Sequence, residues 1–339
     1  APGPSSWADG ANGVRSGPVG IRASAGRDEL RVASRRARRR WPAEAQRRAR
    51  RPDPAGPWYT IDMTRRRRST PAPDGGWSVR DLPRLRELVV LRERIDDPEG
   101  YPFSVPALRS LDRLTFDRRI TFLVGENGSG KSTLLEAIAL AAGFGAEGGS
   151  RNFTASTSPS TGAVAPLARA LRLSWSKKLT AGFFLRAESL FNVATRVDEL
   201  EAEKPGLYDS YGGKSLHTQS HGESFLALVQ HRFGPGGLYL VDEPEAALSP
   251  QRQLTVLVHL HDLMTSDPDT QVIVATHSPI LLGYPDAAIW SLDGDAIEPI
   301  PWEAVPAVDV TRSFVTGRAY WLSRLLRPSG RDPDGDPTR

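Results

Sequence analysis

The 339-residue chain has no cysteine, two methionines and only five lysines. Without cysteine it can form no disulfide, no cysteine-ligated zinc site and no thiol nucleophile, which fits a reducing compartment. It also lacks any uninterrupted apolar run near the ~18 residues that span a bilayer, and its N-terminus lacks the apolar core of a secretory signal. Its 39% hydrophobic content is enough for a substantial core. These features predict a cytoplasmic globular protein.

The positive charge of the chain is concentrated at its N-terminus. Residues 1–70 contain 17 arginines, no lysine and six acidic residues, a net charge of +11, whereas the whole chain carries +4. Residues 71–339 therefore carry −7. The arginine runs at 35–40, 47–51 and 65–68 are separated by Pro, Gly and Ala without apolar periodicity. We expect a disordered tail over residues 1–75, and a second one over 328–339.

Two interpretations of the arginine-rich tail remain open. It is either an arm that binds polyanions or, over residues 1–62, not native protein. The first methionine is Met63, and 39 arginines against five lysines indicate a G+C-rich coding sequence in which upstream DNA reads through as Arg, Ala, Pro and Gly. A start at Met63 would give a net charge of −3 and would remove the argument for nucleic-acid binding from the pI near 9.5.

A phosphate-binding loop is the strongest motif of the sequence. Residues 125–133 read GENGSGKST, follow an apolar run and precede a helix-like stretch. In the pattern G-x-x-x-x-G-K-[ST], backbone N–H groups curl around phosphate oxygens, the lysine meets the β and γ phosphates, and the hydroxyl binds Mg²⁺. The predicted ATP-binding residues are Gly125, Glu126, Asn127, Gly128, Ser129, Gly130, Lys131, Ser132 and Thr133, with Ser132 also a metal ligand.

The surrounding pattern is that of an α/β domain, a mixed sheet core flanked by helices, over residues 76–327 with a small helical lobe at about 145–220. An exposed Gly-, Ser- and Thr-rich loop is expected over 143–165, and a helix over 132–142. Strands are predicted at 88–95, 101–108, 114–124, 171–176, 181–189 and near 287–293, and a terminal helix at 319–326.

A second motif, LYLVDEPEAALSP at residues 238–250, places two carboxylates after a buried strand. In a parallel sheet this is the edge where ligands bind. Asp242 is predicted to hold Mg²⁺ and Glu243 to orient and polarise the attacking water. The alternative is a solvated acidic turn in which Glu245 caps the next helix.

Two further segments fit a nucleotide site. Ser220, Gly222 and Glu223 in QSHGE begin an amphipathic helix whose positive end and hydroxyl suit a γ-phosphate, although Ser220 alone would be an ordinary N-cap. His277 follows the strand QVIVA and is predicted to contact the γ-phosphate, or else is an ordinary histidine at a strand end. His221 also remains a candidate.

In this order the motifs GENGSGKST, QSHGE, VDEPEAALSP and ATHSP resemble the P-loop, signature, Walker B with D-loop, and switch histidine of ABC-class ATPases. More narrowly, residues 85–325 resemble the small stand-alone ATPases related to the RecF and SMC-type proteins. The resemblance implies a head-to-tail dimer with two ATP molecules between P-loop and signature. Ser220 and Gly222 would then act in trans, and residues 247–249 would line the seam.

The chain departs from that pattern in three places. Transporter ATPases carry a glutamine on the strand after the P-loop helix, whereas this chain offers Arg186 and Glu188. No residue is identified as the adenine contact: Tyr101 and Phe103 are candidates, but both are typical of buried strand aromatics. Only 86 residues separate Thr133 from Ser220, and they lack heptads, so no long coiled coil is expected.

These observations predict ATP binding and Mg²⁺-dependent hydrolysis, with Lys131, Glu243 and His277 as catalytic residues. We expect an ATP-dependent homodimer that acts as a switch on an unknown protein or nucleic acid. One alternative is a DNA repair or defence ATPase, for which DNA should stimulate turnover. The other is the ATP-binding subunit of a membrane transporter, which the missing glutamine makes less favoured.

Overall fold

The computed structural model describes residues 82–151 and 159–326, all within one unit of the chain, Gly75–Arg339. The tails predicted over 1–75 and 328–339 lie outside the described residues. Among the helices in these two ranges, none combines the length and apolarity needed to cross a membrane.

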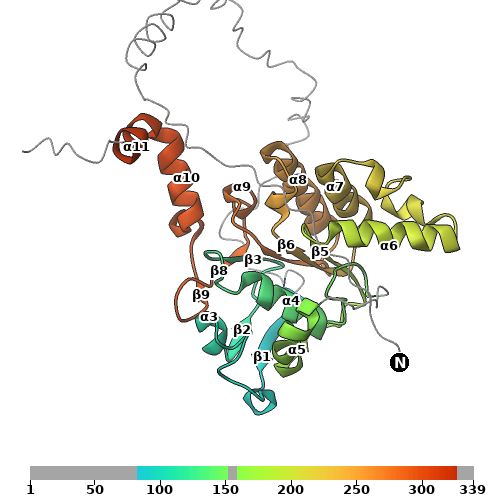
Figure 1. Cartoon of the computed structure of the whole chain (residues 1–339), viewed down its shortest axis with the longest axis horizontal. Helices are drawn as coiled ribbons and strands as arrows, with labels where there is room; N and C mark the ends of the chain where they lie inside the picture. The colour runs from blue at the N-terminus through green and yellow to red at the C-terminus, as the bar shows by residue number, and fades with distance from the viewer. Residues whose placement is uncertain (1–81, 152–158, 327–339) are drawn as a thin grey trace, which may run out of the picture. The chain divides into compact units, whose positions relative to one another are not determined.

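A six-stranded sheet with the order β5-β6-β7-β3-β8-β9 forms the centre of the domain (Figure 1). All neighbours pair in parallel except β8 and β9. Every residue of β3, β6 and β7 is buried, as expected for parallel strands covered on both faces. The strands are β3 (Ile120–Val124), β5 (Ala181–Arg186), β6 (Gly237–Asp242), β7 (Gln271–Ala275), β8 (Ala288–Ser291) and β9 (Glu298–Pro299).

A smaller antiparallel sheet with the order β2-β1-β4 packs against the same core. Its strands are β1 (Leu85–Val90), β2 (Arg113–Thr115) and β4 (Leu171–Trp175). Gln271, the first residue of β7, links it to the central sheet, because its side-chain amide accepts from the N–H of Leu85 and donates to the carbonyl of the same residue. The two sheets are therefore joined by buried hydrogen bonds as well as by apolar packing.

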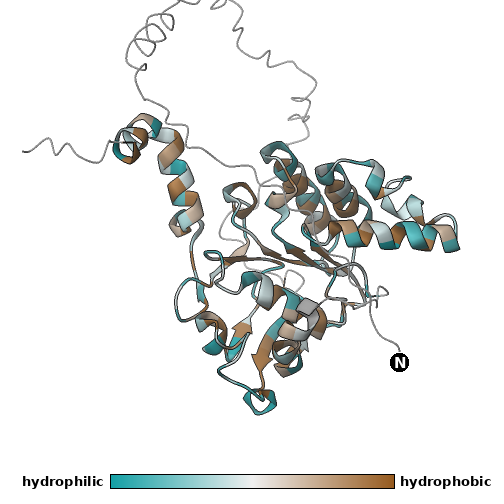
Figure 2. Cartoon of the chain, viewed as in Figure 1, coloured by the Kyte–Doolittle hydropathy of each residue, from teal (hydrophilic) through white to brown (hydrophobic). Residues whose placement is uncertain are grey.

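Alternating side chains of the central strands divide the core into two layers. Phe183 and Leu185 of β5 belong to the layer under α6, α7 and α8, whereas Phe184 between them belongs to the layer with α4, α5 and the small sheet. Figure 2 shows the strands as the most continuous apolar part of the domain. Complete burial of one such side chain contributes roughly 1.5–3 kcal/mol, so these layers supply most of the stability.

Local signals set the helix starts. Helix α7 begins after a capping box of Ser220 and Glu223, and α8 begins with Ser249 as N-cap and Pro250 in its first turn. The helices are α3 (Pro106–Arg109), α4 (Lys131–Ala141), α5 (Pro159–Ala170), α6 (Leu190–Glu203), α7 (His221–Arg232), α8 (Pro250–Ser266), α9 (Pro279–Leu282), α10 (Pro306–Thr316) and α11 (Arg318–Leu325). Short 3₁₀ turns lie at Arg92–Arg94, Leu207–Tyr211, Leu216–Thr218, Pro244–Ala246 and Trp302–Ala304.

Several predicted elements differ from the structure. Residues 101–108 form no strand: Pro106, which lacks a backbone N–H, begins helix α3 there. The strand predicted at 88–95 starts earlier and ends at Val90, and the one at 114–124 is two strands, β2 and β3, with residues 116–119 between them. Residues 159–165 of the predicted loop are helical. Within the segment 145–220, predicted as a helical lobe, the strands predicted at 171–176 and 181–189 are present as β4 and a shorter β5, one in each sheet.

Candidate functional site

The predicted P-loop lies where β3 meets α4. Gly130 precedes the helix with φ 97°, a left-handed conformation that favours glycine, and an added Cβ would lie 3.1 Å from side-chain atoms of Val105 and Leu108. Lys131 is 3% exposed, and its Nζ donates to the carbonyl oxygens of Gly125 at 2.8 Å and Glu126 at 3.1 Å. The loop therefore curls around a buried ammonium group.

Burial lowers the pKa of Lys131, while four nearby carboxylates raise it, Glu243 and Asp242 most strongly. The lysine thus stands in an acidic surrounding at one edge of the sheet. A phosphate group entering the loop would bring negative charge to the same ammonium group, as expected for a nucleotide site.

Asp242 ends β6 directly beside the P-loop helix. The Ser132 hydroxyl donates to Asp242 Oδ1 at 2.8 Å, and Asp242 is 5% exposed. Burial raises the pKa of its carboxyl to about 6, although Arg186 and the hydrogen bond from Ser132 oppose this rise. The fit to Mg²⁺ is good, because a hydroxyl and a carboxylate, the oxygen donors this ion uses beside nucleotide phosphates, already meet at hydrogen-bond distance.

Glu243, the next residue, has a strained backbone. Its φ of 46° and ψ of 54° are left-handed, a conformation that costs a non-glycine residue about 1–3 kcal/mol. Its N–H donates to the carbonyl of Ala275 at 2.9 Å, which fixes the turn against β7. Its side chain is 38% exposed and lines a pocket of about 340 Å³ beside the P-loop with Lys131 and Ser132.

His277 lies just beyond the end of β7 and faces Glu243. Its Nε2 is 3.9 Å from Glu243 Oε1, and within the described ranges this nitrogen has no hydrogen-bond partner. The predicted acidic pair and histidine therefore meet at one edge of the sheet, from the neighbouring strands β6 and β7.

Glu245 holds this arrangement in place. Its carboxylate accepts from the Thr276 hydroxyl at 2.7 Å and from the backbone N–H of His277. Glu245 does not cap the next helix, which was the alternative interpretation, because its hydrogen-bond partners lie on the loop after β7. The sequence marks Glu245 only as the third carboxylate of the DEPE motif. It gives no indication of the two partners on the loop after β7.

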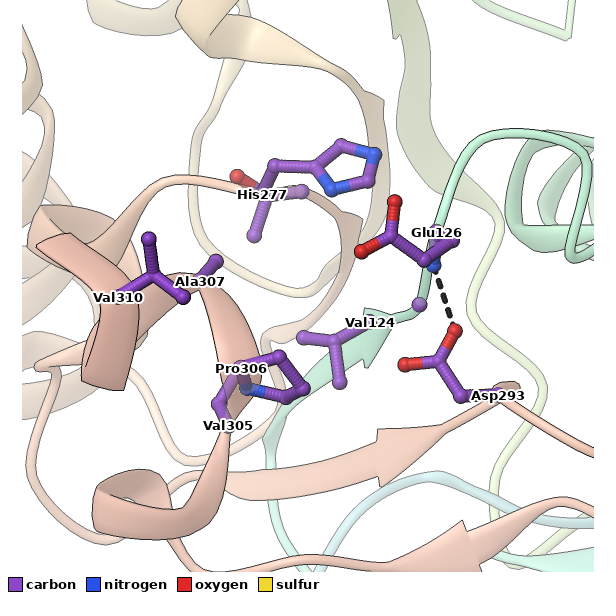
Figure 3. Close-up of a pocket in the computed structure, with 10 residues that line it drawn as sticks. Val124, Glu126, His277, Asp293, Val305, Pro306, Ala307 and Val310 are labelled. Atoms are coloured by element: carbon purple, nitrogen blue, oxygen red, sulfur yellow. Dashed lines mark hydrogen bonds between the residues drawn. The ribbon is translucent and has the colours of Figure 1, made fainter. Parts of the chain in front are cut away.

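A second pocket, of about 190 Å³, has His277 in its lining (Figure 3). Its lining joins the P-loop to the C-terminal part of the domain: Val124, Gly125, Glu126, Thr276, His277, Asp293, Val305, Pro306, Ala307 and Val310. Asp293 Oδ1 accepts from the backbone N–H of Glu126 at 2.6 Å. Sequence reasoning missed Asp293, which lies two residues past β8.

The predicted signature residues lie at the start of α7, away from the P-loop pockets. Neither of the two pockets is lined by Ser220, Gly222 or Glu223. Ser220 donates to the Glu223 carboxylate from its hydroxyl at 2.7 Å and from its N–H at 3.0 Å, which lowers the pKa of Glu223. Gly222 is in close contact with the loop after Glu243, since an added Cβ would lie 2.7 Å from the Ala247 carbonyl oxygen.

The two aromatic candidates for adenine differ in environment. Phe103 is 1% exposed and belongs to the core, as the interpretation of a buried aromatic predicts. Tyr101 is 50% exposed, lines the P-loop pocket, and its hydroxyl is 2.7 Å from the Thr133 hydroxyl, so the same interpretation is wrong for it. His221, the other open candidate, is exposed at the start of α7.

At the position of the missing glutamine, Arg186 ends β5 opposite Asp242 in the strand register. Its guanidinium forms ion pairs with Asp242 and with Glu136 of helix α4. Glu136 was not singled out in the sequence, where it reads as one polar residue of an apolar helix.

Two family models match the chain. The first, "AAA domain", covers residues 105–166, which include the P-loop; the second, "AAA domain, putative AbiEii toxin, Type IV TA system", covers residues 223–283, which include Asp242, Glu243 and His277. No relative among curated proteins matches the sequence. The two matched segments are thus similar to AAA domains, and together they hold the P-loop and the strand-end residues Asp242, Glu243 and His277.

Solved structures of ABC ATPases also resemble the chain. One is cbiO1 from Clostridium perfringens, part of the ABC transporter complex cbiONQ, at 15% identity and TM-score 0.38 over 72% of this chain and 99% of that one. Another is the ATP-binding subunit of an ABC transporter, at 18% identity and TM-score 0.35 over 72% and 100%. Identities and TM-scores this low give no information about the process in which this chain acts.

Proposed function

We propose that the chain hydrolyses ATP with Mg²⁺, through Lys131, Ser132, Asp242, Glu243 and His277. The observation that supports this most directly is the pocket beside the P-loop, where Lys131, Ser132 and Glu243 line one space. Asp242 contacts Ser132, and His277 faces Glu243. A lysine, a pair of oxygen donors and a candidate base on adjacent elements are the groups that phosphoryl transfer to water needs.

Each residue has a separate role in this proposal. Lys131 binds the β and γ phosphates with the backbone N–H groups of the loop. Ser132 and Asp242 hold Mg²⁺, which when bound neutralises phosphate charge. Glu243 accepts a proton from the attacking water. The water oxygen bonds to the γ-phosphorus while the bond between the γ-phosphorus and the ADP oxygen breaks. His277 donates a hydrogen bond to the γ-phosphate and reports its loss.

We further propose that two copies form an ATP-dependent, head-to-tail dimer. Ser220 is exposed, begins a helix of 12 residues, and lies outside the pockets of its own P-loop. A second copy would bring Ser220 and Gly222 to the γ-phosphate bound by the first, with residues 247–249 at the seam. The N–H groups of the helix start then meet negative charge.

The Glu243→Gln variant tests both proposals. It keeps the size of the side chain but removes the base, so ATP with Mg²⁺ should convert the monomer into a stable dimer in light scattering while turnover falls at least about a hundredfold. Lys131→Ala is the matched control and should neither dimerise nor bind ATP tightly. Turnover of Glu243→Gln at the rate of the unchanged protein would contradict the assignment.

A second candidate, a defence ATPase, is favoured by the match of residues 223–283 to the family described as "AAA domain, putative AbiEii toxin, Type IV TA system". Such a protein would turn over ATP in response to a nucleic acid or a cognate protein. Stimulation of turnover by DNA, with a steep decrease as salt is raised, would support it. Turnover that is insensitive to DNA would exclude a DNA-driven role.

A further inference from the structure

Arg186 lies between two buried carboxylates at the edge of the candidate site. Its Nη1 donates to Glu136 Oε2 at 2.8 Å, and its Nε is 3.4 Å from Asp242 Oδ2. The side chains of Arg186, Glu136 and Asp242 are 15%, 4% and 7% exposed. One guanidinium therefore serves two carboxylates that have little access to water.

The contacts of the guanidinium are uneven. The hydrogen bond to Glu136 is of ordinary length, whereas Arg186 Nε, though near Asp242, has no hydrogen-bond partner in the described part of the chain. Glu136 Oε1 is also without one there. A buried charged cluster with unused donors and acceptors costs stability, so its presence at this edge calls for a role beyond packing.

The geometry at Asp242 indicates what this role is. The Ser132 hydroxyl contacts Oδ1, and Arg186 attracts Oδ2, so the two oxygens of one carboxylate are held by groups from α4 and β5. A guanidinium has no lone pair for a metal, so Arg186 can act on a cation only through Asp242. Its planar fork is fixed on its other side by Glu136.

We propose that Arg186 is a positioning residue for the metal-binding carboxylate. Glu136 fixes the guanidinium, and the guanidinium turns Asp242 so that Oδ1 stays beside Ser132. This inference rests on the proposed Mg²⁺ site and adds to it a supporting pair, Arg186 and Glu136. The pair aligns the carboxylate before nucleotide arrives.

The test measures how much Mg²⁺ strengthens nucleotide binding, not turnover. The probe is mant-AMPPNP, a fluorescent ATP analogue that is not hydrolysed, and its Kd is determined in Mg²⁺ and in EDTA. Arg186→Met alone leaves two buried carboxylates without a cation and is expected to fold poorly. The double variant Arg186→Met, Glu136→Gln removes one charge of each sign, so the buried cluster keeps its net charge.

In EDTA the double variant should bind the probe within about twofold of the unchanged protein, because Lys131 and the loop are intact. The factor by which Mg²⁺ lowers the Kd of the probe should be about tenfold smaller in the double variant than in the unchanged protein. This is the usual effect of losing a group that orients a metal ligand. Arg186→Lys keeps the positive charge but lacks the planar guanidinium, so it should recover part of the effect of Mg²⁺ on the Kd. The exposed pair provides the matched control, Arg92→Met with Asp112→Asn, which should change neither value.

The outcomes separate the two proposals. Unchanged strengthening by Mg²⁺ in the double variant would overturn the role of Arg186 and leave the metal site standing. Tight binding to the unchanged protein with no effect of Mg²⁺ would refute the metal site and this inference with it.

Discussion

Replacing Asp242 with asparagine should remove a pH-dependent loss of stability from the nucleotide-free protein. Burial raises the pKa of the Asp242 carboxyl from 3.8 to about 6. The folded protein therefore holds this proton at pH values where the unfolded chain has released it. The stability that protonated Asp242 contributes is fully present below the pKa of this carboxyl in the unfolded chain. It is lost as pH rises through its pKa in the folded protein. At ~1.4 kcal/mol per pH unit, the difference corresponds to roughly 3 kcal/mol.

The assay is urea unfolding in EDTA at pH 4.5 and pH 7.5. Most of this stability is still present at pH 4.5 and almost none at pH 7.5, so the free energy of unfolding of Asp242→Asn, relative to the unchanged protein, should rise by about 2 kcal/mol between them. Taking the difference between the two proteins cancels the titration of groups that do not interact with Asp242. Asp112→Asn, which removes an exposed carboxylate, is the matched control. A difference that stays constant over this range would refute the reasoning.

Three further predictions concern the surroundings of the site. Gly222→Ala places a methyl group 2.7 Å from the Ala247 carbonyl oxygen and should weaken ATP-driven dimerisation more than about tenfold in light scattering, while the mant-AMPPNP affinity of the monomer stays the same. Glu245→Ala frees the loop that carries His277, so steady-state kinetics should show kcat reduced about tenfold at similar KM; an unchanged kcat would contradict this role. Asp293→Ala removes the acceptor for a P-loop N–H and should raise the Kd of mant-AMPPNP about fivefold, whereas an equal affinity would show that the loop holds its shape alone.

The sequence predicts those parts of the fold in which local pattern and chemistry agree. The strands at 120–124, 238–242 and 271–275 are apolar runs that end in polar motifs, and each is a buried strand of the central sheet. Tyr101–Leu108 has the aromatic and apolar content of a strand, but its two prolines remove N–H donors that a sheet would use. Aromatic and apolar composition alone therefore overestimates the strand content of this segment.

The supporting residues of the site could not be predicted in the same way. The hydrogen bond from Glu126 to Asp293 joins positions 167 residues apart, and that from Arg186 to Glu136 spans 50. No short motif connects such pairs, since the strand order brings them together. The residues that would touch phosphate lie in contiguous motifs, whereas the residues that orient them come from other elements.

The contact between Gly222 and Ala247 has a consequence for how two such sites would communicate. Ala247 lies four residues after Glu243, and Gly222 opens the helix whose start would face the nucleotide of a second copy. Within one subunit, the short segment from Glu243 to Ala247 therefore links the proposed base to the surface proposed to face the other site. In the proposed dimer, a change of the nucleotide bound at one site would shift this segment and so affect the other site. The two sites should therefore hydrolyse ATP in alternation or in concert rather than independently.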